Sequence, residues 1–327
     1  MSLECNKMVD LSTSIFLKTS LIINLSLAIL AIPVIIWATW KIWSMKYTKL
    51  FHVNFKIVVQ LHLIGFFLHC SGRTILHTMD LINYSTKDDP CDMVPNIYRC
   101  FILRFMYNGG LWITNTTAVS LIVERWLATK RSVTYEKDSV MFGMFLAVMQ
   151  FVITAIPLFF LYYNFHLDDV MYYCVTAQAT LPYTPQLSAF LGISFQVTAR
   201  VSFHFLYRQN KQLRQSTFHS TLSNRYQLEQ NISSIACLKT FANITSVYVV
   251  LQNACYITLM YFAKTLHSYQ YYAFVEFICA YPAYAIFTAV VMTRKMRQIR
   301  KSTEKQLVGH LNTPNQHYFD SFKQQIA

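Results

Sequence analysis

The sequence contains few charged residues: Asp, Glu, Lys and Arg make up 13% of its 327 residues, against about 25% in ordinary soluble domains. Hydrophobic residues account for 54%, and the mean hydropathy is +0.31. A soluble fold of this length would lack the polar side chains to cover its surface, whereas a protein embedded in lipid needs no such cover. The composition therefore excludes an ordinary soluble protein and indicates one that crosses a membrane repeatedly.

The sequence also lacks internal repeats and low-complexity linkers, so we expect one domain over residues 1–327. Its apolar residues are bunched into seven blocks, each near the roughly 20 residues that a helix needs to span a bilayer core. The predicted fold is an all-α membrane protein with a bundle of seven transmembrane helices. The second and fifth blocks contain ionisable residues and have the weakest pattern. The blocks lie at about 20–40, 53–76, 101–123, 140–163, 187–207, 234–262 and 271–293.

Catalytic patterns are absent as well: there are no paired catalytic carboxylates, no nucleophile with a plausible base and no Gly-rich phosphate loop. His69 and His77 are about 12 Å apart along a helix axis, which is too far for one metal ion. We therefore expect no enzyme activity, no cofactor and no metal site.

Lys and Arg are unevenly divided between the two sides of the predicted bundle. Of 28, 20 lie in loops on the same side as residues 41–56 and 7 on the opposite side. Because cytoplasmic loops carry the excess of basic residues, we expect an extracellular N-terminus (1–19), the bundle (20–293) and a cytoplasmic tail (294–327). The net charge of +13 then belongs to the inner face, spread over four loops, and nucleic acid is not an expected partner.

Cysteines and a glycosylation signal agree with this orientation. Cys5, Cys91, Cys100 and Cys174 fall outside or at the outer rim, where oxidising conditions let disulfides persist. Asn83 begins an Asn-Tyr-Ser glycosylation signal in an outer loop. Other such signals fall in spans or inside, where we expect them to be inert.

The third block ends on Glu124-Arg125, at its inner mouth. Taken alone, the pair is an interfacial stop signal, hydrated at the membrane boundary. Cys100 lies 25 residues before Arg125, about 37 Å along a helix and close to one bilayer thickness. This cysteine, Cys174 in the next outer loop, the acid–arginine pair, seven spans and a basic tail together resemble rhodopsin-like G-protein-coupled receptors.

This resemblance implies that Arg125 is a switch. At rest it pairs with Glu124 and with an acid near the sixth helix, for which Glu229 is the candidate; on activation it is freed towards a G protein. The resemblance also implies a bridge from the third helix to the second outer loop. The pairings that follow are Cys100–Cys174 as first choice, Cys5–Cys91 as a second bridge, and Cys91–Cys174 as the alternative.

A closer resemblance is to the nematode serpentine chemoreceptors of the Sra superfamily, and it covers essentially the whole chain. Cys5, Met8 and the FHVNFK stretch favour class alpha/beta over class alpha. The stretches that carry the resemblance are LFHVNFK (50–56), ERWLATK (124–130) and LSNRYQLEQNISS (222–234).

Membership implies a G-protein-coupled chemosensory receptor in the plasma membrane of ciliated sensory neurons. Its partners would be the lipid bilayer, a heterotrimeric G protein and a small odorant or pheromone-like ligand. Glu124 and Arg125 correspond to the family's Glu-Arg motif, and Arg225 to its Arg-Tyr-Gln motif. Arg225 belongs to a basic inner surface that fits either a G protein or lipid headgroups. The oligomeric state is left open.

Polar residues in the outer halves of the spans are candidates for a ligand pocket. The alternative is an internal salt bridge between Glu276 and Arg73 or Arg104. Two arginines against one carboxylate leave spare positive charge, which would suit an anionic ligand. The predicted pocket residues are Arg73, His77, Arg104, Asn108, Trp112 and Glu276.

Two other functions fit a seven-helix protein. A ligand-gated cation channel of the insect odorant-receptor kind has its N-terminus inside, which the distribution of basic residues opposes. A transporter is favoured by discontinuous helices in two corresponding halves, and the sequence has no such repeat. At the tail, the basic stretch 294–301 predicts a short interfacial amphipathic helix.

Overall fold

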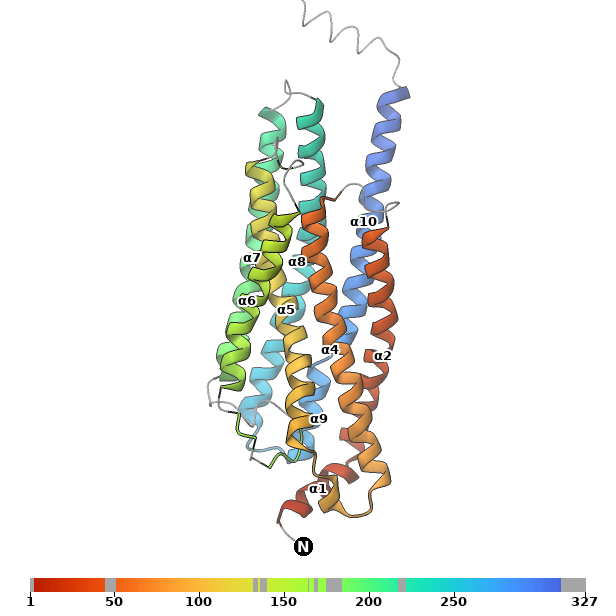
Figure 1. Cartoon of the computed structure of the whole chain (residues 1–327), viewed down its shortest axis with the longest axis vertical. Coiled ribbons are helices and arrows are strands. Elements are labelled where there is room, and N and C mark those ends of the chain that lie inside the picture. The colour runs from red at the N-terminus through yellow and green to blue at the C-terminus, as the bar shows by residue number, and fades with distance from the viewer. Residues whose placement is uncertain are drawn as a thin grey trace, which may run out of the picture.

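The computed structural model describes residues 3–44, 51–131, 135, 140–163, 165–167, 170–174, 184–216 and 222–312. Every regular element within these segments is helical, and the long helices lie side by side along the long axis (Figure 1). In chain order the elements are α1 (Leu3–Thr13), α2 (Ile15–Trp43), α4 (Val53–Thr86), the short 3-10 helix η1 (Pro90–Met93), α5 (Ile97–Lys130), α6 (Met141–Tyr162), α7 (Thr184–Ser216), α8 (Leu222–Phe262), α9 (Ser268–Ile278) and α10 (Tyr281–Asn312).

The predicted seven-helix bundle is confirmed: in the described chain the crossings are α2, α4, α5, α6, α7, α8 and the pair α9–α10. Five helical segments are apolar and long enough to cross a membrane on composition alone, and α5 and α7 are not among them. Between Asn108 and Thr117, α5 carries several buried Asn and Thr side chains. Its low hydropathy therefore comes from residues that face the interior of the bundle.

Element boundaries differ from the predicted ones at both ends of the bundle. α2 begins at Ile15, where Ser14 Oγ accepts from the Leu17 amide at 3.2 Å, and α1 forms within the predicted extracellular segment. At the other end α10 continues to Asn312, so the prediction of a separate interfacial helix at 294–301 is wrong. No Gly or Pro interrupts residues 283–308, so nothing ends the helix there.

The seventh crossing, expected as one helix, is broken between Ile278 and Tyr281. Pro282 has no amide hydrogen, and its ring clashes with the carbonyl four residues earlier in a continuous helix. It is tolerated in the first turn of a new helix, where it lies in α10. The break leaves carbonyl groups at the end of α9 that need other donors.

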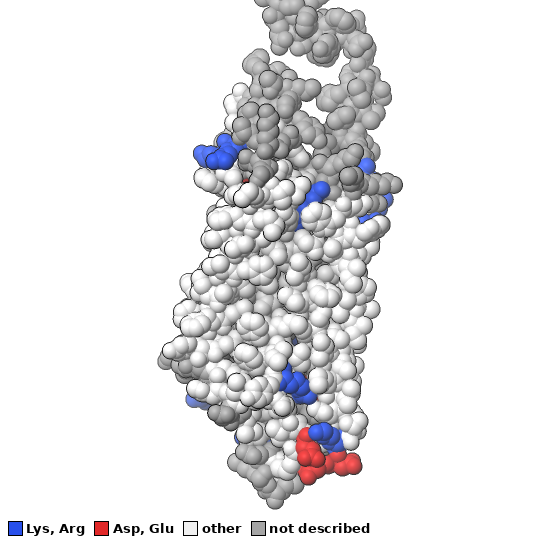
Figure 2. Space-filling view, viewed as in Figure 1, with Lys and Arg blue, Asp and Glu red and all other residues white. Residues whose placement is uncertain are grey.

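Two disulfides lie at the end of the molecule that the charge distribution assigns to the outside. Cys5–Cys91 joins α1 to η1, and Cys100–Cys174 joins the first turn of α5 to the loop before α7. These are the two predicted bridges, and the alternative Cys91–Cys174 is not formed. On the face in Figure 2, charged side chains gather toward the two ends, with a broad uncharged band between them.

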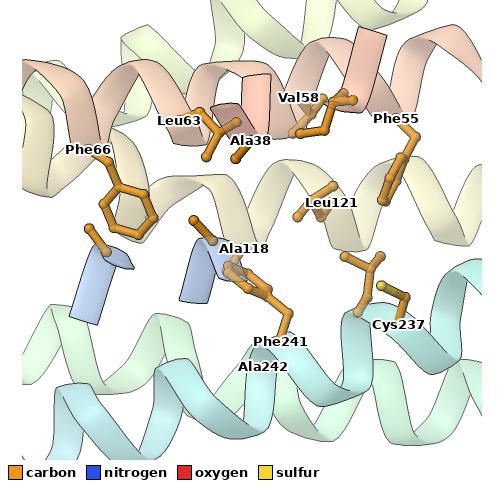
Figure 3. Packing of buried hydrophobic residues seen from close by; sticks show 14 of the residues in the cluster. Ala38, Phe55, Val58, Leu63, Phe66, Ala118, Leu121, Cys237, Phe241 and Ala242 are labelled. Atoms are coloured by element: carbon orange, nitrogen blue, oxygen red, sulfur yellow. The ribbon is translucent and has the colours of Figure 1, made fainter. Parts of the chain in front are cut away.

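A hydrophobic core fills the inner half of the bundle, with buried residues from α2, α4, α5, α6, α7, α8 and α10. Phe55, Phe66 and Phe241 interdigitate with small residues such as Ala38 and Ala118 (Figure 3). Between helices in lipid, association depends on such close packing, because the lipid tails are as apolar as the side chains.

Gly65 of α4 and Gly110 of α5 let these two helices approach closely. A methyl group added to Gly110 would lie 2.3 Å from the Gly65 carbonyl oxygen, and one added to Gly65 would lie 2.8 Å from the Gly110 carbonyl oxygen. Real carbon atoms do not come so near to backbone oxygen. The neighbouring Gly109 has room, since its added methyl would meet nothing nearer than Leu158 at 3.9 Å.

We expect Gly110→Ala to lower the stability of the bundle by about 1–3 kcal/mol, because α4 and α5 must separate to admit the methyl group. Gly109→Ala is the matched control and should be tolerated. Thermal unfolding of the purified full chain in detergent measures both. Equal midpoints for the two variants would contradict the close approach.

Candidate functional site

Glu124 and Arg125 form a buried ion pair at the inner end of α5. Their exposed fractions are 0% and 3%, and Arg125 donates through Nε and Nη2 to the two carboxylate oxygens of Glu124. The guanidinium carbon also lies 5.3 Å from the ring centre of Phe55 in α4. A stop signal at the interface would be hydrated, so the burial favours a specific role for the pair.

Hydrogen bonds tie Arg125 to two further helices. Its Nη1 donates to Asn231 Oδ1 of α8 at 3.1 Å, and Asn231 Nδ2 donates to Asn210 Oδ1 of α7 at 2.8 Å. Both amides also donate to Thr129 Oγ1, at 3.0 and 2.9 Å, and that hydroxyl donates to the Arg125 carbonyl at 2.8 Å. We call Arg125, Thr129, Asn210 and Asn231 the inner latch, which joins α5, α7 and α8.

Tyr135 closes the inner mouth beside this latch. Its hydroxyl donates to Glu124 Oε1 at 2.5 Å, and its ring packs against His52 at 4.7 Å. Burial, with the nearby Glu124 carboxylate, raises the pKa of Tyr135, so the phenol keeps its proton and remains a donor. The cavity between Tyr135, Arg125 and Asn231 is about 30 Å³, room for little more than water.

The predicted partner Glu229 does not contact Arg125: it pairs with Arg214 of α7, and both side chains are more than 40% exposed. Residues 229 and 231 point roughly 200° apart around a helix, so only one of them faces α5. Sequence analysis missed Asn231, although it lies within the quoted stretch 222–234. Arg225 lies in α8, but its side chain is outside the described residues.

A second charged cluster lies in the outer half of the bundle, around Glu276 of α9. Arg73 of α4 donates to Oε2, while Arg104 of α5 and the Tyr173 hydroxyl donate to Oε1 at 3.1 and 2.9 Å. His77 Nε2 accepts from Arg73 Nε at 3.0 Å. We call these five residues the outer cluster; all are buried. The internal salt bridge considered as the alternative to a ligand pocket is therefore present, and it uses both arginines.

Arg73 also caps the break in the seventh crossing. Its Nη1 donates to the Cys279 carbonyl and its Nη2 to the Glu276 carbonyl at 3.3 Å. Asn24 of α2 donates to the same Glu276 carbonyl at 2.8 Å. Arg73 thus supplies donors for carbonyl groups that α9 leaves unpaired, a structural task that Arg104 does not share.

Tyr173 reaches the cluster because the adjacent Cys174 is held by its disulfide to α5. The Tyr173 ring stacks on Tyr272 at 4.7 Å, and Met8 and Leu11 of α1 belong to the same buried hydrophobic cluster. Burial raises the pKa of Tyr173, so its hydroxyl stays protonated as a donor to Glu276. The outer loop and α1 together cover the charged residues.

The outer cluster carries an unbalanced positive charge, because two guanidinium groups face one carboxylate. The nearby Asp80 does not compensate, since it pairs with Arg99 at 2.8 Å. Arg104 Nε and His77 Nδ1 are buried and have no hydrogen-bond partner within the described chain. An anion beside Arg104 would balance the charge and accept from its unpaired nitrogen.

Two predicted pocket residues lie elsewhere. Asn108 donates to the Tyr162 hydroxyl of α6 at 2.8 Å, and Trp112 lies buried two turns beyond Arg104 on α5. The structure therefore gathers Arg73, His77, Arg104 and Glu276 but not these two. Asn83, expected in a loop, lies in the last turn of α4, where its carbonyl accepts from the Lys87 amide.

Comparison with known sequences identifies a matching family over nearly the whole chain. Residues 2–327 match the profile of a family described as serpentine type seven-transmembrane GPCR receptor class ab chemoreceptor. The match supports class alpha/beta, which the sequence stretches favour over class alpha.

Relatives from Caenorhabditis elegans span three classes. Serpentine receptor class beta-17 is 24% identical over 283 residues, covering 84% of this chain and 77% of that protein. Serpentine receptor class alpha/beta-14 is 25% identical, covering 68% of this chain and 59% of that protein. Serpentine receptor class alpha-39 is 22% identical, covering 61% of this chain and 54% of that protein.

We expect Glu276→Gln to destabilise the bundle by about 3–5 kcal/mol, because two buried arginines would lose the one carboxylate that pairs with them in the described segments. Arg104→Gln removes the unbalanced charge and should cost less than about 1 kcal/mol. Thermal unfolding of the full chain in detergent compares the two. An equal loss of stability in both variants would refute the unbalanced charge.

Proposed function

The chain belongs to the serpentine seven-transmembrane receptors of class ab, a chemoreceptor family, and we propose that it signals to a heterotrimeric G protein when a small external ligand binds its outer cluster. The proposed location is the plasma membrane of a sensory cilium. Family membership and the apolar helices support a multi-pass chemosensory receptor, and the two charged sites supply the mechanism.

The observation that carries the proposal is the inner latch. Arg125 donates to the neutral amide of Asn231 in α8, which in turn donates to Asn210 in α7, and the charge of Arg125 is satisfied by the adjacent Glu124. Separating the inner ends of α7 and α8 from α5 breaks the bonds between these helices, and Arg125 keeps its ion pair with Glu124 within α5. The exposed guanidinium then becomes available to a G protein, which makes the latch a two-state element.

The ligand class follows from the outer cluster. We propose a small anionic ligand, such as a carboxylate, that takes over Arg104 from Glu276. Arg104 has an unpaired buried Nε and no second structural task, whereas Arg73 must keep capping α9. Because a ligand shifts an equilibrium only by its differential affinity, the exchange must favour the state in which Glu276 has moved.

A short path joins the two sites through the broken seventh crossing. Arg73 binds the Cys279 carbonyl, and two residues later the Tyr281 hydroxyl bonds Thr114 in the middle of α5. Tyr284, one turn on, bonds Thr245 of α8 at 2.8 Å. Motion of Glu276 would therefore pull on the start of α10, which bonds two of the three helices of the latch, α5 through Tyr281 and α8 through Tyr284.

We expect Arg125→Ala to abolish ligand responses while the receptor reaches the surface, because the freed guanidinium is the proposed contact with the G protein. Asn231→Ala should raise the basal signal several-fold, because it removes the bond to α8. Cells with a cAMP or calcium reporter, screened with small carboxylates, odorants and water-soluble cues, provide the readout.

Arg208→Ala is the matched control, since Arg208 is exposed on the inner part of α7 and lies outside the latch. An N-terminal tag stained on intact cells normalises for surface expression and tests the orientation. Responses of Arg125→Ala equal to those of Arg208→Ala would exclude the switch.

For the ligand site, Arg104→Gln should abolish responses to anionic ligands, whereas Arg99→Gln, five residues earlier on α5, should preserve them. Arg99 pairs with Asp80 and takes no part in the outer cluster. Dose–response curves at matched surface expression measure the difference. Unchanged responses in Arg104→Gln would remove the outer cluster as the ligand site while leaving the latch untouched.

A further inference from the structure

A groove opens between the inner parts of α2 and α10, away from both sites described above. Its volume is about 590 Å³, against about 30 Å³ for the cavity beside Arg125. α2 and α10 lie side by side at one edge of the bundle (Figure 1), whereas the latch joins α5, α7 and α8. An occupant of the groove would therefore come from the surrounding bilayer.

The walls of the groove change in chemistry along the helices. Pro33 and Trp37 of α2 and Val290 of α10 make one part apolar. Lys41 lies about two turns beyond Pro33 toward the inner end of α2, and Arg294 lies about one turn beyond Val290 on α10. Arg297 lies three residues beyond Arg294 on the same face of α10. Among the described residues that line the groove there are three cations and no acid.

Tryptophans place the boundary of the membrane at this level. Trp37 and Trp40 are 39% and 60% exposed, and the Lys41 ammonium lies 4.3 Å from the centre of the Trp40 ring. Trp is enriched where hydrocarbon meets headgroups. The apolar part of the groove then lies at acyl-chain depth and the three cations at the depth of inner-leaflet phosphates.

We propose that this groove binds an anionic phospholipid of the inner leaflet. Its phosphate and a further acidic headgroup lie among Lys41, Arg294 and Arg297, and one acyl chain lies along Pro33, Trp37 and Val290. Each basic residue near an anionic headgroup strengthens binding about fivefold. A zwitterionic lipid would gain less, because its own ammonium group offsets the phosphate.

The proposal is tested by native mass spectrometry of the full chain in detergent, titrated with phosphatidylserine or phosphatidylcholine of the same acyl chains. Wild type should retain one phosphatidylserine and bind it at least tenfold more tightly than phosphatidylcholine. The double variant Arg294→Gln/Arg297→Gln should lose roughly 30-fold in affinity for phosphatidylserine.

Two further variants separate charge from shape. Arg208→Gln/Lys211→Gln removes two exposed basic residues at the same spacing on α7 and should keep wild-type selectivity. Val290→Trp fills the apolar part of the groove, keeps every charge, and should release the lipid.

Three results would overturn the proposal. Equal retention of the two lipids by wild type would mean an ordinary lipid shell only. An equal loss in the α7 and α10 double variants would mean attraction to the whole inner face. A dimer mass that Val290→Trp abolishes would mean that a second copy of the chain fills the groove. The wild-type comparison decides the question even where a variant fails to fold.

Discussion

The Glu276 carboxylate, bound by Arg73 and Arg104, is the interaction on which the outer half of the bundle depends. In lipid an unpaired charge costs several kcal/mol, so these three side chains must stay together or find other partners. They come from α4, α5 and α9, and Arg73 also binds carbonyl groups at the end of α9, where the seventh crossing is broken. In the proposed mechanism the same need for partners makes the cluster responsive, because an incoming anion would offer Arg104 an equivalent bond.

The inner end solves the same problem in another way. Arg125 finds its carboxylate in the preceding residue, so its charge is neutralised within α5 and remains so when helices move. The hydrogen bonds that cross to α7 and α8 end on the uncharged amides of Asn210 and Asn231, so no second ion is needed there. Charge holds the outer half of the molecule together, whereas weaker hydrogen bonds close its inner half.

The fold was predictable because hydropathy is a local property of the chain. Seven apolar blocks predict seven crossings, and the resemblance to rhodopsin-like receptors implies the bridge at the top of α5. The partner of Arg125 was not predictable in this way, since the choice between Glu229 and Asn231 depends on the rotation of α8 against α5. Asn108 and Arg104 share a helical face in sequence, but Asn108 meets α6, which no spacing along one helix specifies.

The weakness of the hydrogen bonds that close the inner latch has a consequence for the signal in the absence of a stimulus. Hydrogen bonds between membrane helices contribute about 0.6 kcal/mol each on average, so the three that join α5 to Asn210 and Asn231 amount to roughly 2 kcal/mol. A closure of that strength, taken alone, would leave a few per cent of receptors open at any moment without stimulus. Under the proposed mechanism, a cell with many copies would signal at a steady background rate, and a weak stimulus would need to add only a small increment to that rate.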